Sequence, residues 1–132
     1  MAESTNTMHV ELVSPERKLF SGEATIVIAR PEGGDAAFLP GHAPFLGLLG
    51  VGPVTIRTAD GKEVRAAIHG GFIEVRNNNV TILSDVAELS SEIDVTRAAE
   101  AKARLEGSSH GLSDAARAAA LCRATTRLAV TG

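Results

Sequence analysis

The stretch from Val54 to His69, VTIRTADGKEVRAAIH, decides the fold of the first part of the chain. The dipeptide Asp60-Gly61 separates two runs, Val54–Thr58 and Glu63–His69, that are rich in apolar and β-branched residues. Asp-Gly between two such runs is a strong signal for a tight turn, because both residues tolerate the positive φ angles that the turn requires. The stretch therefore predicts a pair of antiparallel strands.

Strand signals continue on both sides of this hairpin, at residues 8–12, 24–30, 72–76 and 80–84. In residues 8–12 (MHVEL) apolar and polar side chains alternate, which is the period of a strand with one buried face. Turn residues recur about every ten positions, and we assign Gly47, Gly50 and Gly52 to such turns. Parallel strands need a long crossover, and no helix-length segment lies here. We therefore expect an all-β sandwich or barrel with antiparallel pairing.

The composition changes sharply near Ile93. Residues 1–93 contain ten of the thirteen glycines, all five prolines and all four phenylalanines, whereas 11 of the 39 later residues are alanine. The charge changes too: residues 1–93 carry 7 basic and 12 acidic side chains, and residues 94–132 carry 6 and 4. We therefore expect two domains, a β-sandwich over residues 1–92 and a helical unit over residues 93–132.

The sequence of residues 93–132 predicts two helices joined by a short loop. Asp94 is the residue type of an N-cap for a helix over Val95–Glu106, which contains no Pro or Gly and ends before Gly107. A second helix is expected over Ala115–Val130. Short alanine-rich helices are marginal in isolation. We therefore expect an antiparallel two-helix hairpin that needs a partner surface, either its own sandwich or another chain.

Composition argues against several classes of function. The 132 residues have a net charge of −3 and only 3 % aromatic residues, so the chain lacks the positive field and the aromatic faces of nucleic-acid-binding proteins. Cys122 is the single cysteine, and the four histidines lack ligand spacing, so we expect neither a disulfide framework nor a metal site. The polar N-terminus has no signal-peptide pattern, and no run of about 18 apolar residues occurs. We therefore expect no membrane insertion.

Arginines carry the most informative chemistry. No nucleophile elbow, zinc-protease motif or phosphate-binding glycine loop occurs, so no catalytic residue is predicted. On a helical wheel Asp94, Arg97 and Arg104 share one face of the first helix, and Arg123 and Arg127 lie one turn apart on the second. The four arginines either clamp a polyphosphate, whose oxygens suit the guanidinium fork, or are solvated surface residues.

The segment from Pro40 to Pro44, PGHAP, is the second informative feature. Two prolines restrict the backbone and Gly41 permits a turn, so we expect a stiff loop that presents His42. The loop is either a simple connector or a rigid contact point for a partner.

Five segments, in order, resemble the epsilon subunit of bacterial F-type ATP synthases. They are VSPERKLFSG (13–22), PGHAP (40–44), GGFIEV (70–75), NVTILSD (79–85) and IDVTRA (93–98). The resemblance is in register over about residues 8–106 and looser beyond. It implies an N-terminal β-sandwich followed by a two-helix hairpin, in agreement with the change of composition near Ile93.

The resemblance also implies a function: a non-catalytic subunit of the rotating central stalk, peripheral at the cytoplasmic face of the cell membrane. The sandwich would bind the gamma subunit and the membrane rotor ring, through a face that includes Asp35, Gly41 and His42. The hairpin would fold down on the sandwich, or extend to the alpha/beta head and oppose ATP hydrolysis.

No cofactor is required, but ATP is implied as a regulatory ligand of the folded-down state. The residues implied for it are Glu88, Ile93, Asp94, Arg97, Ala98, Arg104, Arg123 and Arg127. Asp94 would accept from the nucleotide or merely cap its helix. The second helix is short. Its length limits how far the hairpin could extend toward the head, and it also affects how the arginines could surround a nucleotide. The alternatives are a free-standing nucleotide-sensing module, and a β-sandwich adaptor unrelated to ATP synthase.

Overall fold

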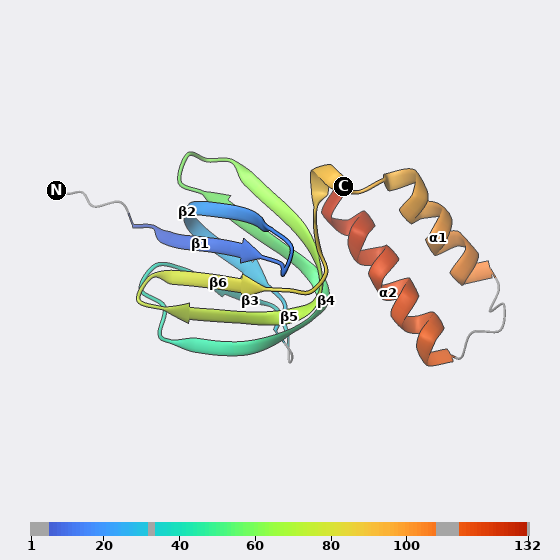
Figure 1. The fold of residues 1–132 in the computed structure, drawn as a ribbon, viewed down its shortest axis with the longest axis horizontal. Helices are drawn as coiled ribbons and strands as arrows, with labels where there is room; N and C mark the ends of the chain where they lie inside the picture. The colour runs from blue at the N-terminus through green and yellow to red at the C-terminus, as the bar shows by residue number, and fades with distance from the viewer. Residues whose placement is uncertain (1–5, 32–33, 108–113, 132) are drawn as a thin grey trace.

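The computed structural model describes residues 6–31, 34–107 and 114–131 (Figure 1). Its strands are β1 (Met8–Val13), β2 (Lys18–Ala29), β3 (Ala36–Phe38), β4 (Phe45–Thr58), β5 (Glu63–Arg76), β6 (Asn79–Leu83) and β7 (Ala87–Leu89). They are followed by a 3-10 helix, η1 (Ser90–Glu92), and by two α-helices, α1 (Val95–Gly107) and α2 (Asp114–Thr131). The predicted β-sandwich followed by two helices is confirmed.

The strand pairings close into a ring. β1 pairs with both β2 and β6, and the order continues from β6 through β5 and β4 to β2. β3 pairs with β2 and β7 with β5. These pairs are antiparallel except that of β1 with β6, which is parallel with Val10 opposite Val80. The expectation of antiparallel pairing throughout is wrong, because the whole segment from β2 to β5 connects the two parallel strands and no crossover helix is needed.

Strands β4 and β5 are longer than the sequence predicts. β5 runs through Gly70 and Gly71, which have φ angles of +93° and +152°, and does not restart at Phe72. A Cβ atom on Gly71 would clash with the carbonyl oxygen of Leu83, so only glycine lets β6 approach so closely. Gly47, Gly50 and Gly52 lie inside β4 and not in turns. Gly47 is needed there because a Cβ would lie 2.8 Å from the ring of Phe45.

The hydrophobic core lies inside the sandwich. The residues that alternate with polar neighbours in β1, namely Met8, Val10 and Leu12, are fully buried as predicted. They pack with Phe38 and with the inward-facing side chains of β2, β4, β5 and β6. Such a core, shared by all the long strands, holds the sandwich together by apolar burial.

The two helices lie side by side and antiparallel at one end of the sandwich, opposite the N-terminus (Figure 1). Both helices are predicted to within one residue at each end, and the loop between them, residues 108–113, lies outside the described residues. α2 packs against both β4 and β5, and its last turn returns to η1. The C-terminal half of α2 is therefore the element that fastens the hairpin to the sandwich.

Candidate functional site

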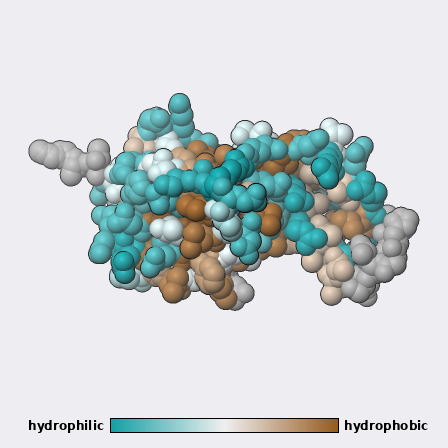
Figure 2. Space-filling model, in the orientation of Figure 1, coloured by the Kyte–Doolittle hydropathy of each residue, from teal (hydrophilic) through white to brown (hydrophobic). Residues whose placement is uncertain are grey.

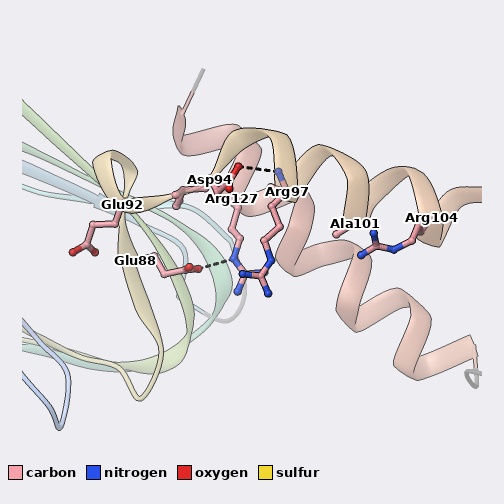
Figure 3. Close-up of a pocket in the computed structure, with 9 residues that line it drawn as sticks. Glu88, Glu92, Asp94, Arg97, Ala101, Arg104 and Arg127 are labelled. Atoms are coloured by element: carbon pink, nitrogen blue, oxygen red, sulfur yellow. Dashed lines mark hydrogen bonds and ion pairs between the residues drawn. The ribbon is translucent and has the colours of Figure 1, made fainter.

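A cleft of about 480 Å³ lies where β7 and η1 meet the two helices (Figure 3). It is lined by Glu88, Glu92, Ile93, Asp94, Arg97, Ala98, Ala101, Arg104 and Arg127. All the residues that the resemblance implies for ATP line it, except Arg123. Glu92 was not predicted as a site residue. Ala101 lies on the face of the first helix that carries Arg97 and Arg104.

Glu88 connects the sandwich to the second helix. It lies on β7, and its Oε1 accepts a hydrogen bond of 2.6 Å from Nε of Arg127 on α2 (Figure 3). The same Oε1 lies 3.0 Å from Nε2 of His69 on β5. Burial by itself would raise the pKa of Glu88, but the hydrogen bonds from Arg127 and His69 outweigh it and hold the pKa below the ordinary value. Glu88 is therefore an ionised carboxylate shared between a cation and an imidazole.

His69 is a member of this cluster that sequence analysis did not single out. Its side chain is only 4 % exposed, and its Nδ1 is buried without a hydrogen-bond partner among the described residues. Burial is the main reason that its pKa is lowered. The only sequence signal was its position next to the two glycines of β5, and pairing with Glu88 requires knowing that β7 lies beside β5.

Asp94 caps α1, as its residue type predicts. Its Oδ1 accepts a hydrogen bond of 3.0 Å from the backbone N–H of Arg97. This bond uses one of the two carboxylate oxygens, and Asp94 also lines the cleft. The capping role is therefore observed, and a second role toward a ligand stays a prediction.

The guanidinium groups of the cleft differ in their partners. Arg127 is paired with Glu88, whereas the exposed side chains of Arg97 and Arg104 have no hydrogen bond or ion pair within the described part of the chain. In the view of Figure 3 the side chains of Arg97 and Arg127 point the same way, and Arg104 lies two turns further along α1. Arg97 and Arg104 thus line the cleft without an ion pair to any described residue.

Glu92 and Arg123 are less directly involved in the cleft than Glu88, Arg97 and Arg127. Nη2 of Arg17 lies 2.7 Å from the Glu92 carboxylate, which also accepts the backbone N–H of Leu89. Arg17 is the main cause of the lowered pKa of Glu92. Arg123 is half-buried on α2 and does not line the cleft, but its charge acts on His69.

The loop of residues 40–44 has the exposed histidine that the sequence predicts. Gly41 has a φ angle of +84°, and its N–H donates to Oδ1 of Asn78, 2.7 Å away in the turn between β5 and β6. The ring of the exposed His42 packs edge-on against Phe38, with centroids 5.0 Å apart. Asp35 lies at the opposite end of β3, where it pairs with Arg30 at 2.7 Å.

A row of apolar side chains on the outside of the sandwich was not predicted. Leu48, Phe72 and Leu83 are cross-strand neighbours on β4, β5 and β6, and each is about half exposed, at 49 to 50 %. Val13 lies opposite Leu83 on β1 and extends the row. Figure 2 shows hydrophobic side chains reaching the surface of the sandwich between polar ones. The signal in the sequence was FLGLL (45–49), which is apolar at successive positions and so places apolar side chains on both faces of a strand.

Comparisons with known proteins give the family. Residues 7–90 match the family described as ATP synthase, Delta/Epsilon chain, beta-sandwich domain. The chain is 53 % identical over 105 residues to the ATP synthase epsilon chain of Streptomyces coelicolor, which covers 78 % of this chain and 85 % of the relative. It is 44 % identical over 124 residues to that of Thermobifida fusca, covering 92 % and 89 %.

Solved structures share the fold. A chain of the mitochondrial ATP synthase of Euglena gracilis is similar with a TM-score of 0.74 and 20 % identity, over 98 % of this chain and 80 % of that one. A chain of the central stalk and c-ring of the Tetrahymena thermophila mitochondrial ATP synthase gives 0.60 and 18 %, over 98 % and 100 %.

The fold and the sequence match define the first part of the chain as a β-sandwich of the delta/epsilon type. At 53 % identity over most of its length, the chain belongs to the family of ATP synthase epsilon chains. In the described ranges, no helix is both long and apolar enough to cross a membrane. Within the same ranges, no three His, Cys, Asp or Glu side chains are grouped to hold a metal ion.

Proposed function

We propose that the protein is a non-catalytic subunit of the central stalk of a proton-translocating F-type ATP synthase, peripheral at the cytoplasmic face of the cell membrane. The sandwich contacts the gamma subunit and the rotor ring, and the helical hairpin opposes ATP hydrolysis when it extends to the alpha/beta head. Family membership supports the assembly. The exposed row of Leu48, Phe72 and Leu83 supports a protein partner, because apolar patches on a sheet face are typical of interfaces.

The ligand of the cleft is ATP in this proposal. The observation that carries it is the pair Arg97 and Arg104, whose guanidinium groups have no partner among the described residues and line a cleft of about 480 Å³. That volume is in the range of small-molecule sites. A polyphosphate would receive charge-assisted hydrogen bonds from the arginines, and Asp94 offers an acceptor for the ribose or the base.

ATP would act as a regulator because the cleft is built from three elements. Glu88 comes from β7, Arg97 from α1 and Arg127 from α2, so a bound molecule contacts both the sandwich and the hairpin. A ligand that binds only the docked arrangement stabilises it by mass action. ATP therefore holds the hairpin on the sandwich and withdraws it from the head.

Thermal melting of the isolated subunit with increasing ATP tests the site. The melting temperature should rise with ATP, and Arg97→Ala should abolish the rise. Arg76→Ala, a change of the same type on an exposed residue of β5, is the matched control and should leave the rise intact. Arg123→Ala should also leave it largely intact, because Arg123 does not line the cleft. No rise and no calorimetric heat at millimolar ATP would remove ATP from the proposal.

Two changes on the sandwich test the assembly. Phe72→Glu places a charge in the exposed apolar row, and His42→Glu places one in the loop of residues 40–44; each should weaken capture of the gamma subunit and ring. Lys62→Glu, in the exposed turn between β4 and β5, is the matched charge change. Equal capture by all three variants would contradict both contact surfaces.

The regulatory role is tested in the assembled enzyme. Removal of residues 94–132 should leave an enzyme that contains the sandwich and hydrolyses ATP faster. Unchanged hydrolysis would mean that the hairpin does not inhibit this enzyme, whatever the outcome of the binding tests.

A further inference from the structure

His69 is a buried titratable group that the proposed function does not use. It lies on β5, the strand against which α2 packs, and its side chain is 4 % exposed. Its backbone N–H is bonded to the carbonyl of Val86, so the ring is held in place beside β7. Its Nε2 faces Glu88, and its Nδ1 is buried with no partner among the described residues.

The contacts of the ring define its favoured state. Glu88 is an acceptor, so Nε2 carries the proton and donates to Oε1, and Nδ1 keeps its lone pair. A second proton would sit on Nδ1, where a buried N–H would have no acceptor, an arrangement that costs free energy. The docked structure is therefore built around a neutral imidazole.

The charges around His69 act in opposite directions, and burial decides the net effect on its pKa. Glu88 on β7 attracts a positive imidazole, but its Oε1 is already shared with Arg127. Arg127 and Arg123, both on α2, oppose a positive charge at His69. β4 adds no charge at the position paired with His69, which is Val51. Burial is the largest influence, followed by Glu88 and then the arginines, and together they lower the pKa of His69.

We propose that His69 is a protonation-sensitive latch: the neutral ring lets α2 dock on the sandwich through Glu88 and Arg127, and protonation of the ring releases α2. When α2 is away, the ring loses the cover of the hairpin and the repulsion of the two arginines. The undocked state therefore binds a proton that the docked state does not. The contribution of His69 to docking is fully present above the ordinary histidine pKa of about 6.5, and the docking equilibrium weakens as the pH falls below it, by up to about tenfold per pH unit.

The latch concerns docking alone and needs no nucleotide. Where the hairpin regulates hydrolysis, which rests on the proposed function, acidification would favour the extended posture. Acid and ATP would then act in opposite directions on the same equilibrium, because one weakens and the other strengthens the docked state.

Amide hydrogen exchange of the full-length subunit without nucleotide tests the latch. Protection factors of α2 amides should fall in the wild type between about pH 7.5 and about pH 5.5, by up to about tenfold, while those of β1 and β5 stay constant. His69→Gln keeps an N–H donor for Glu88 but does not titrate, so its α2 protection should be flat over this range. His9→Gln, on an exposed histidine of β1, is the control and should behave as the wild type.

A second measurement keeps the test decisive if His69→Gln docks poorly at every pH. The imidazole signal of His69 in the wild type should titrate below the ordinary histidine pKa of about 6.5, and its titration should coincide with the loss of α2 protection. A parallel loss in wild type and His69→Gln would overturn the latch and assign the effect to a carboxylate. Titration of His69 at or above the ordinary histidine pKa would overturn it as well. Neither result depends on whether the cleft binds ATP.

Discussion

The sandwich and the hairpin are held by different forces. In the sandwich, sixteen buried apolar residues form one cluster that all five long strands share. In the described parts of the helices, the buried apolar residues are Ala98, Ala124 and Val130. The attachment of α2 to the sandwich includes the hydrogen bond of Arg127 with Glu88. One part of the chain is therefore fixed, and the other is attached by little apolar area and by polar contacts.

This difference suits a movable element. Full burial of a large aliphatic or aromatic side chain contributes roughly 1.5–3 kcal/mol, and the small side chains of the hairpin contribute less each. Polar contacts exchange readily for water, so they add specificity at a low net free energy. We therefore expect that the hairpin can leave the sandwich without unfolding it, and the predictions below test that separation.

The largest effect is expected in the core. Phe38 is 1 % exposed and contacts the rings of His42 and Phe45, so Phe38→Ala should lower the free energy of unfolding by about 3–5 kcal/mol. Val130→Ala, at a buried position of α2, removes two methyl groups and should cost roughly 1–2 kcal/mol, in hairpin docking only. Urea unfolding measures the loss of stability in each variant, and the exchange protection of β1 and α2 shows whether the sandwich or the hairpin is affected. Equal loss of protection in β1 for both variants would show that the domains are not separable.

The second effect isolates backbone geometry inside the sandwich. Gly71→Ala would place a Cβ against the carbonyl oxygen of Leu83, where backbone must move, and should cost at least about 2–3 kcal/mol. Gly70→Ala is the matched change: Gly70 also has a positive φ, of +93°, but nothing lies within 4 Å of its Cβ position. It should cost about 1–2 kcal/mol from the strain alone. Thermal melting that ranks the two in the opposite order would contradict the close approach of β6.

Local patterns in the sequence predicted the elements that carry strong local signals. The Asp-Gly turn, the alternation in residues 8–12 and the N-cap at Asp94 each depend on neighbouring residues, and the structure contains all three. The parallel pairing of β1 with β6 was missed because its partners are about 70 residues apart. The three-residue strands β3 and β7 were missed because they are too short for a period to show.

The candidate site was also predicted only in part. The resemblance named seven residues that the structure brings together around one cleft. It did not name His69, because nothing in the sequence places a histidine of β5 beside a glutamate 19 residues later. It also did not name the apolar row, because the exposure of Leu48 and Phe72 follows from which face of the sheet lies inside.

A smaller effect is expected at the start of the hairpin. Asp94→Ala removes the acceptor for the backbone N–H of Arg97 and should destabilise α1 by about 1 kcal/mol, with no change in the sandwich. Asp94→Asn keeps a capping oxygen and should cost less. If Asp94 serves only as a cap, Asp94→Asn binds ATP as the wild type does. Helix content by circular dichroism and an ATP titration of both variants separate capping from binding.

The smallest effect is expected where the two regions meet at the surface. Arg17, in the turn between β1 and β2, pairs with Glu92 of η1, and their side chains are 53 % and 34 % exposed. Exposed pairs contribute about 0–1 kcal/mol, so Arg17→Ala should lower the melting temperature only slightly. Arg17 is also the main cause of the lowered pKa of Glu92, so the contribution is present above the ordinary glutamate value and is lost as the pH falls through the lowered one. The melting temperatures of wild type and Arg17→Ala should therefore differ near pH 7 and converge in acid, below the lowered pKa of Glu92. A difference that persists in acid would mean that Arg17 acts through packing and not through its charge.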